Sequence, residues 1–205
     1  MPMAPGPRAC HRAGMPIPRR LPAWTLPAIG LCAWLATAAV AQPLAGSKTL
    51  RLHAQDGSAV VLGTVRFTPQ ADGRSAFALQ LDPAAFQDFF LSMKEFKCVQ
   101  APAEVFCHVP YPYPQPGSVA PGDLAWLEHS LLFMFKTPSE FGAKLWNGVY
   151  YQLRPQGDGL VGTPQAVDLN RISAPPAQAG VPPFRPALRD DIAPSARWFN
   201  RLSID

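Results

Sequence analysis

The side chains in this sequence that could perform acid–base chemistry are a Glu–His pair and two of the other histidines. Glu128 and His129 are adjacent in a stretch of helical spacing, whereas His53 and His108 lie in stretches that alternate like strands. A positioned carboxylate and imidazole can transfer protons in hydrolysis. Adjacent helical side chains, however, point about 100° apart and do not face one target. Glu128 with His129, or His108, are therefore the catalytic candidates of a hydrolase interpretation, and hydrogen-bonded structural residues are the alternative.

Motifs for nucleotides and metals are the next chemistry to consider. Gly157 to Gly162 reads G-x-G-x-x-G, the letters of a dinucleotide-binding loop. Such a loop needs a helix to begin there, because the helix N-terminus holds the pyrophosphate. Here a β-type run and Pro164 follow, which predicts a hairpin turn. H-E-x-x-H and G-x-S-x-G are both absent from the sequence, so we expect neither a metal site nor a cofactor.

Tyrosines and a tryptophan offer a binding surface instead. Tyr111 and Tyr113 alternate with prolines, which predicts a polyproline II segment that loses little entropy on binding. Exposed tyrosines suit a glycan or a protein partner, and the alternative is a stiff strap packed across a sheet. Trp146 and Tyr150 are likewise either exposed binding residues or packed structural residues. Strand alternation puts Tyr150 and Tyr151 on opposite faces, so one of them is expected to be exposed or to line a cavity.

The start of the chain has the pattern of a cleaved secretory signal. Arg19 and Arg20 precede an apolar run, and a small-x-small sequence ends at Ala41. This order predicts a signal peptide over residues 1–41 and a single exported domain over residues 42–205, in the periplasm or outside the cell.

An uncleaved membrane anchor is the competing interpretation of this leader. An anchor needs roughly twenty apolar residues, and the run here is slightly shorter and is interrupted by Pro27. We therefore expect no membrane insertion once the leader is removed.

Charge excludes nucleic acid as a partner of the predicted mature part. The formal net charge of +4 equals the four arginines of the leader, which has no acidic residue. Residues 42–205 contain fourteen basic and fourteen acidic residues and no Lys/Arg cluster. They therefore lack the patch of Lys and Arg side chains that binding to a nucleic-acid phosphate backbone requires.

Cys98 and Cys107 are the only cysteines of residues 42–205. In an oxidising compartment two cysteines this close favour a disulfide, which in the chain-entropy description contributes roughly 2.7 kcal/mol. Redox pairs usually place their cysteines two residues apart, and zinc needs further ligands at close spacing.

Most of the elements that must position these side chains are strands. Glycine, proline and polar turns separate short β-rich runs, and Gly63 inside one run marks a bulge. The last run, residues 196–204, fits a strand or a helix. The other expected strands are residues 49–53, 59–67, 76–81, 96–99, 105–109, 149–153 and 160–169.

Helices are expected to be few. Asp82-Pro83 predicts the start of a short helix with Phe86, Phe89 and Phe90 on one face. Asp123 is expected to cap the longest helix, Leu124–Phe135, and a second short helix follows over residues 140–145. A Pro-rich segment, residues 174–186, predicts an extended tether. The fold class is α+β, a mainly antiparallel sheet of about seven strands, able to curl toward a barrel, with two or three short helices.

Over residues 50–204 the sequence resembles a family of secreted proteins of Gram-negative bacteria. The resemblance implies an exported single domain and attaches to it no activity, cofactor or site residue. It is carried by Phe96-Lys97-Cys98, the run from Cys107 to Tyr113, Leu127-Glu128-His129, the run from Leu145 to Tyr151, and the run from Gln165 to Asn170.

The leading prediction is a soluble periplasmic binding or interaction module for a small molecule, a glycan or an envelope protein. Its expected contact residues are Tyr111, Tyr113, Trp146 and Tyr150. One alternative is a small cell-envelope hydrolase that uses the Glu–His candidates above. Another is an assembly or structural component of the envelope whose Pro-rich segment docks on another protein.

Overall fold

Alternation of apolar and polar residues makes most of this chain a β-protein. The computed structural model describes residues 43–88, 97–178 and 180–205, which belong to one compact unit. The strands of these residues are β1 (Gly46–Ala54), β2 (Ala59–Pro69), β3 (Ser75–Leu81), β4 (Gln87–Asp88), β5 (Lys97–Gln100), β6 (Val105–His108), β7 (Ser118–Val119), β8 (Phe133–Lys136), β9 (Gly148–Gln156), β10 (Gly159–Val167), β11 (Asp190–Asp191) and β12 (Phe199–Ile204).

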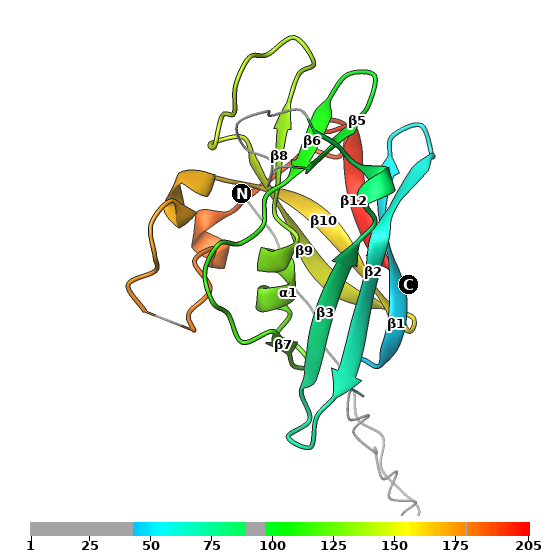
Figure 1. The fold of residues 1–205 in the computed structure, drawn as a ribbon, viewed down its shortest axis with the longest axis vertical. Coiled ribbons are helices and arrows are strands. Elements are labelled where there is room, and N and C mark those ends of the chain that lie inside the picture. The colour runs from blue at the N-terminus through cyan, green and yellow to red at the C-terminus, as the bar shows by residue number, and fades with distance from the viewer. Residues whose placement is uncertain (1–42, 89–96, 179) are drawn as a thin grey trace, which may run out of the picture. The chain divides into compact units, whose positions relative to one another are not determined.

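All these strands join one antiparallel sheet. Its order is β4-β5-β6-β8-β9-β10-β12-β1-β2-β3-β7, and β11 pairs with β10 beside this path. The sheet curls into a half-barrel, and helix α1 (Ala125–Ser130) packs against β7 and β9 (Figure 1). The 3₁₀ turns η1 (Pro83–Ala85), η2 (Leu169–Ile172) and η3 (Pro186–Leu188) complete the elements of the described residues. None of the helices in this part of the chain is long and apolar enough to cross a membrane.

The predicted antiparallel sheet with few helices is confirmed, but the expected number of about seven strands is wrong, because the described residues form twelve. β4, β7 and β11 have two residues each, too few for alternation to appear in a sequence. The last run, residues 196–204, for which the sequence allows a strand or a helix, contains the strand β12. The hairpins β5–β6 and β9–β10 occur where the sequence predicts them.

The longest predicted helix is also wrong in its extent. Leu124–Phe135 divides into the six-residue α1 and the strand β8, which pairs with β6 and β9. Every residue from 131 to 135 is apolar, a run that fits a buried strand as well as a buried helix. The expected cap by Asp123 is also wrong, because the N-cap of α1 is Leu124, which makes no side-chain capping bond; Asp123 Oδ1 accepts the N–H of Ala125 at 3.3 Å just before the helix.

The second short helix predicted over residues 140–145 is absent, and the structure has a loop there. The carboxylate of Glu140 accepts the backbone N–H of Thr137 at 2.8 Å and pairs with Lys144. The bond to Thr137 closes a turn over residues 137–140, and the i,i+4 pair with Lys144 does not extend this turn into a helix.

The segment after β3 forms a shorter helical element than expected. Asp82 caps the single turn η1 by accepting the N–H of Ala84 at 2.9 Å. Phe89 and Phe90, two of the three residues on the expected aromatic face, lie outside the described residues.

Gly63 is at the bulge that the sequence predicts. The register of β1 against β2 shifts between Leu50 and Arg51, opposite Gly63. Its φ of 147° and a gap of 2.1 Å between a built Cβ and the carbonyl oxygen of Gln80 both require glycine at this position.

The first half of strand β9 is buried on both faces, so the expectation that Tyr150 or Tyr151 is exposed or lines a cavity is wrong. Both side chains have an exposed fraction of 0%. Tyr151 belongs to a first core and Tyr150 to a second core, which the chain after β10 covers with Leu169, Ile172 and Phe184. The first core contains Leu50, Leu52, Phe106, Leu127, Phe133, Phe199 and Leu202, and the second contains Val105, Leu132, Met134 and Val167.

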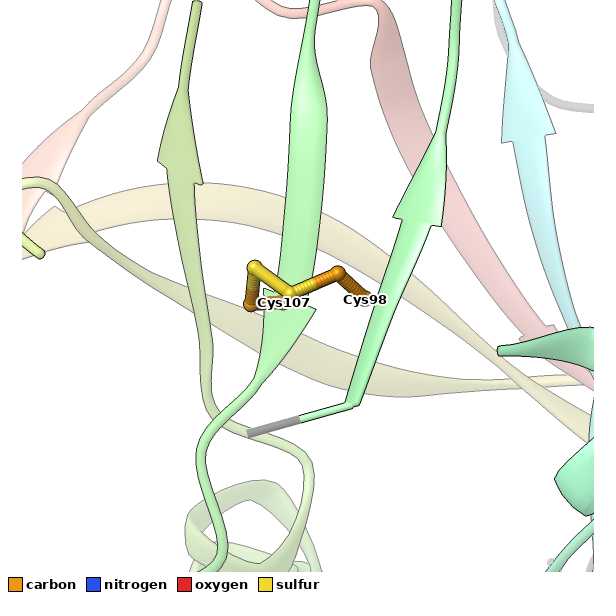
Figure 2. The surroundings of a disulfide bond; sticks show 2 residues. All are labelled: Cys98 and Cys107. Carbon is orange, nitrogen blue, oxygen red and sulfur yellow. A yellow bond between two sulfur atoms is a disulfide. The ribbon is translucent and has the colours of Figure 1, made fainter. Parts of the chain in front are cut away.

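The predicted disulfide is present. Cys98 in β5 and Cys107 in β6 occupy directly paired positions of the hairpin and are bonded through their sulfurs, as Figure 2 shows. Both residues are completely buried, and the bond fixes the hairpin in the second core.

Replacing both Cys98 and Cys107 by alanine is expected to lower the melting temperature by about 5–10 °C, since a loop of this length contributes about 2.7 kcal/mol and a domain of this size melts about 2–4 °C lower per kcal/mol. Scanning calorimetry measures the shift. Reductant in the denaturation buffer should destabilise the wild type and leave the double variant unchanged. An equal melting temperature for the two proteins would show that the bond contributes nothing.

Candidate functional site

His129 lies in α1 and is completely buried. Its Nδ1 is 2.6 Å from the carbonyl oxygen of Ala125, one turn earlier, and its Nε2 accepts the backbone N–H of Phe184 at 3.0 Å. A carbonyl oxygen can only accept, so Nδ1 carries the proton and the ring is neutral. Both nitrogens are therefore engaged, and neither remains for proton transfer to a substrate.

Aromatic rings enclose this imidazole. His129 stacks on Phe184 with a centroid distance of 5.5 Å and meets Tyr150 edge-on at 5.3 Å. Burial lowers the pKa of His129 to about 4, and the nearby Arg189 contributes in the same direction. The contacts favour the structural alternative for this histidine.

Glu128, the other member of the pair, is also buried and faces a different partner. Its Oε2 accepts the hydroxyl of Tyr150, and its Oε1 accepts the backbone N–H of Leu153 at 2.7 Å. Burial raises the pKa of Glu128, an effect that these hydrogen bonds and Arg189 partly oppose. The carboxylate thus connects α1 to β9.

Arg189 completes this group, which we call the Glu128 cluster: Glu128, Tyr150 and Arg189. The guanidinium carbon lies 4.4 Å from the centroid of the Tyr150 ring, a cation–π contact. Nη1 of Arg189 is 3.4 Å from Oε1 of Gln165, and its buried Nε has no hydrogen-bond partner among the described residues.

His108 is separate from this cluster. Its Nε2 is 2.9 Å from the carbonyl oxygen of Ser130 and so donates to it. The ring meets Phe133 edge-on, and burial lowers the pKa of His108. In the described part of the chain, no group of three or more His, Cys, Asp or Glu side chains could hold a metal ion.

The four predicted contact residues do not share one surface. Tyr111 is half-buried and packs on Tyr113, at a centroid distance of 5.7 Å, and on Trp126, at 5.9 Å. This packing resembles the strap alternative more than a free binding surface. Trp146 is 63% exposed in the loop between β8 and β9, whereas Tyr150 is inaccessible inside the second core.

A Ser–His–Asp group that the sequence does not suggest lies on β1 and β12. Nε2 of His53 is 2.8 Å from Oγ of Ser203, whose hydroxyl is 3.4 Å from Asp205. Arg201 donates to Nδ1 of His53, so Nε2 carries the proton and donates to the serine. A nucleophilic serine needs the opposite tautomer, and this group is therefore a surface hydrogen-bond chain.

The described residues form a cleft of about 970 Å³. It opens between the start of the described chain, the segment from β7 to α1, and the tip of the β9–β10 hairpin. Its charged lining residues are Lys48, Asp123, Glu128, Asp158 and Arg189, and its other side chains include Leu44, Ser75, Val119, Leu124, Gln152, Leu153 and Leu160.

Sequence reasoning identified Glu128 in this cleft and missed the cleft itself. The lining residues come from segments that are more than a hundred positions apart, and few of them belong to a motif. One available signal is the Gly157–Gly159 turn, which forms one wall as a hairpin tip instead of a nucleotide loop.

No protein-family model, curated protein or solved structure matches this chain. The resemblance to secreted Gram-negative proteins therefore stays a prediction, and the site is defined by its own geometry.

The neutral ring of His129 predicts a specific pH dependence of stability. Its folded pKa, about 4, is below the ordinary value of 6.5, so its contribution is complete above pH 6.5 and is lost as the pH falls toward 4. The difference in unfolding free energy between wild type and His129→Gln should shrink by about 3 kcal/mol from pH 7 to pH 4. Urea denaturation of the two proteins at pH 7 and at pH 4 measures this difference. A difference that stays constant would contradict the neutral ring.

Tyr150→Phe should destabilise the protein more than Tyr151→Phe. Both hydroxyls are buried donors, but Tyr150 donates to a carboxylate and Tyr151 to the carbonyl oxygen of Phe199 at 2.9 Å. Hydrogen bonds to charged groups contribute about 1.5–3 kcal/mol, against about 1 kcal/mol for neutral ones. Chemical denaturation of the two variants checks this order, and equal losses would show that Glu128 gains nothing from the hydroxyl.

Proposed function

We propose that this chain is a soluble, exported binding module of the periplasm whose ligand site is the cleft beside the Glu128 cluster. The observation that carries the proposal is the size of the cleft, about 970 Å³, since ligand sites of proteins are concavities of roughly 300–1,000 Å³ with a few placed polar groups. Export is supported by the leader pattern and by the buried disulfide, which is typical of oxidising compartments.

The cleft has walls that the fold holds in place. Ser75 Oγ donates to the carbonyl oxygen of Leu44 at 2.7 Å, which attaches the start of the described chain to β3. The backbone of Ala120 exchanges two 2.9 Å hydrogen bonds with Asp123. A preformed site of this kind loses little entropy on binding.

The hydrolase interpretation has less support. Glu128 already accepts two hydrogen bonds, and both nitrogens of His129 are engaged. His108 donates to Ser130 away from the cleft lining. A general base has to reach the proton that it removes, whereas both oxygens of Glu128 and both nitrogens of His129 are already hydrogen-bonded and His108 does not line the cleft.

A second candidate contact surface favours an envelope protein as partner. Phe141 is fully exposed and Trp146 is 63% exposed, both in the loop between β8 and β9. Glu140 fixes the conformation of that loop, and large aromatic residues dominate the energy of protein interfaces. Docking by the Pro-rich segment has less support, because Phe184 of that segment is buried in the second core.

Ligand binding in the cleft can be tested by ¹H–¹⁵N correlation spectra recorded with a panel of peptides, sugars, fatty acids and polyamines. We expect shifts confined to amides of the cleft, such as those of Leu153 and Gly159. Ala120→Trp should fill the cleft and weaken binding about tenfold or more. Ala84→Trp, in the exposed turn η1, is the matched control and should bind as the wild type does. Shifts outside the cleft, or none with any probe, would refute the site.

A further inference from the structure

Charges of both signs line the same cleft, and this limits what can bind there. Lys48 and Arg189 are its cations, and Asp123, Asp158 and Glu128 are its carboxylates. Arg189 and Asp123 both act electrostatically on Glu128, in opposite directions, so the two signs meet around one buried acid. A simple anion would be repelled by the carboxylates, and a polyamine by the cations.

Several of these charges are available to a ligand. Lys48 Nζ is 3.3 Å from Asp158; the Lys48 side chain is 11% exposed and that of Asp158 97%, so the carboxylate of this pair is open to solvent and its ammonium is largely covered. Asp123 accepts the N–H of Ala125 at the long distance of 3.3 Å. Arg189 has a buried Nε that lacks a hydrogen-bond partner in the described residues. The carboxylates of Asp123 and Asp158 can therefore exchange weak or solvent-exposed contacts for a bound molecule, and Lys48 and Arg189 supply the positive charge of the lining.

The remaining surface of the cleft is aliphatic. Its apolar side chains are leucines, prolines, alanines and a valine, and no aromatic ring belongs to the described lining. Sugars are commonly held by stacking on aromatic faces, which this cleft does not offer. The lining fits unbranched or branched aliphatic groups between charged ends.

We propose that the cleft binds short peptides with free termini and aliphatic side chains. The proposal rests on the proposed function and adds the ligand class to it. The peptide carboxylate contacts Lys48 and Arg189, the peptide ammonium contacts Asp123 and Asp158, and the side chains lie against Leu44, Leu124 and Leu160. A zwitterionic chain is the ligand class that pairs both sets of charges at once and also fills an aliphatic lining.

Calorimetry with Leu-Ala-Leu and two blocked forms tests this assignment. The free tripeptide should bind, and N-acetylation or C-amidation should each weaken binding about tenfold. Asp123→Asn should weaken the free peptide and leave the acetylated one unaffected, because the ammonium it contacts is already gone. Lys48→Gln should weaken the binding of the free peptide and leave that of the amidated peptide unaffected, because the carboxylate that Lys48 contacts is already neutral there. Circular dichroism establishes that each variant is folded.

The outcomes separate this proposal from the one on which it rests. If blocking either end leaves the affinity unchanged, or if maltotriose, decanoate or spermidine shifts the cleft amides and the tripeptide does not, the peptide assignment is wrong and the binding function stands. If neither the tripeptide nor any of these probes shifts a cleft amide, both proposals fail. If the tripeptide binds only when its two ends are free, the binding function and the peptide assignment are both supported.

Discussion

The buried carboxylate of Glu128 is the constraint on which the arrangement of α1 and β9 depends. A carboxylate removed from water costs several kcal/mol unless donors replace the lost hydration. The hydroxyl of Tyr150 and the N–H of Leu153 supply them, and both come from β9. The short helix is therefore fixed against the strand by polar contacts in addition to Leu127 in the first core. The same contacts put a charged group at the buried end of the cleft.

The strand content of this chain is visible in its sequence wherever a strand is long and has one solvent face. β1, β2 and β3 alternate, and their meander, including the bulge at Gly63, follows from that pattern. β8 was missed because it is flanked by β6 and β9 and begins inside the unbroken apolar run of residues 131–135. Periodicity then carries no information about helix or strand. β4, β7 and β11 depend on partners distant in sequence, which no local pattern encodes.

The candidate site, like the sheet, could be predicted only where its features are local in the sequence. The disulfide could be predicted from two closely spaced cysteines and the leader pattern, since both are local features of the sequence. The role of His129 could not, because its Nε2 partner is the backbone of Phe184, fifty-five residues away. Tyr150 gave a misleading signal. Its alternation with Tyr151 is real, but the chain after β10 covers the face that would otherwise meet solvent. The cleft arises from walls that only the folded sheet brings together.

The position of β12 has a consequence for how the chain is made. β12 lies between β10 and β1, so the first and last strands of the described chain are neighbours in the middle of the sheet (Figure 1). The hairpins β5–β6 and β9–β10 are local and can form as soon as they have been synthesised, whereas the pairing of β1 must wait for the distant β12. A nascent chain that lacks its C-terminus consists of two unjoined parts of a sheet, each with an open edge. Under the proposed export, a chain that crosses a membrane unfolded would complete this sheet only after β12 has crossed.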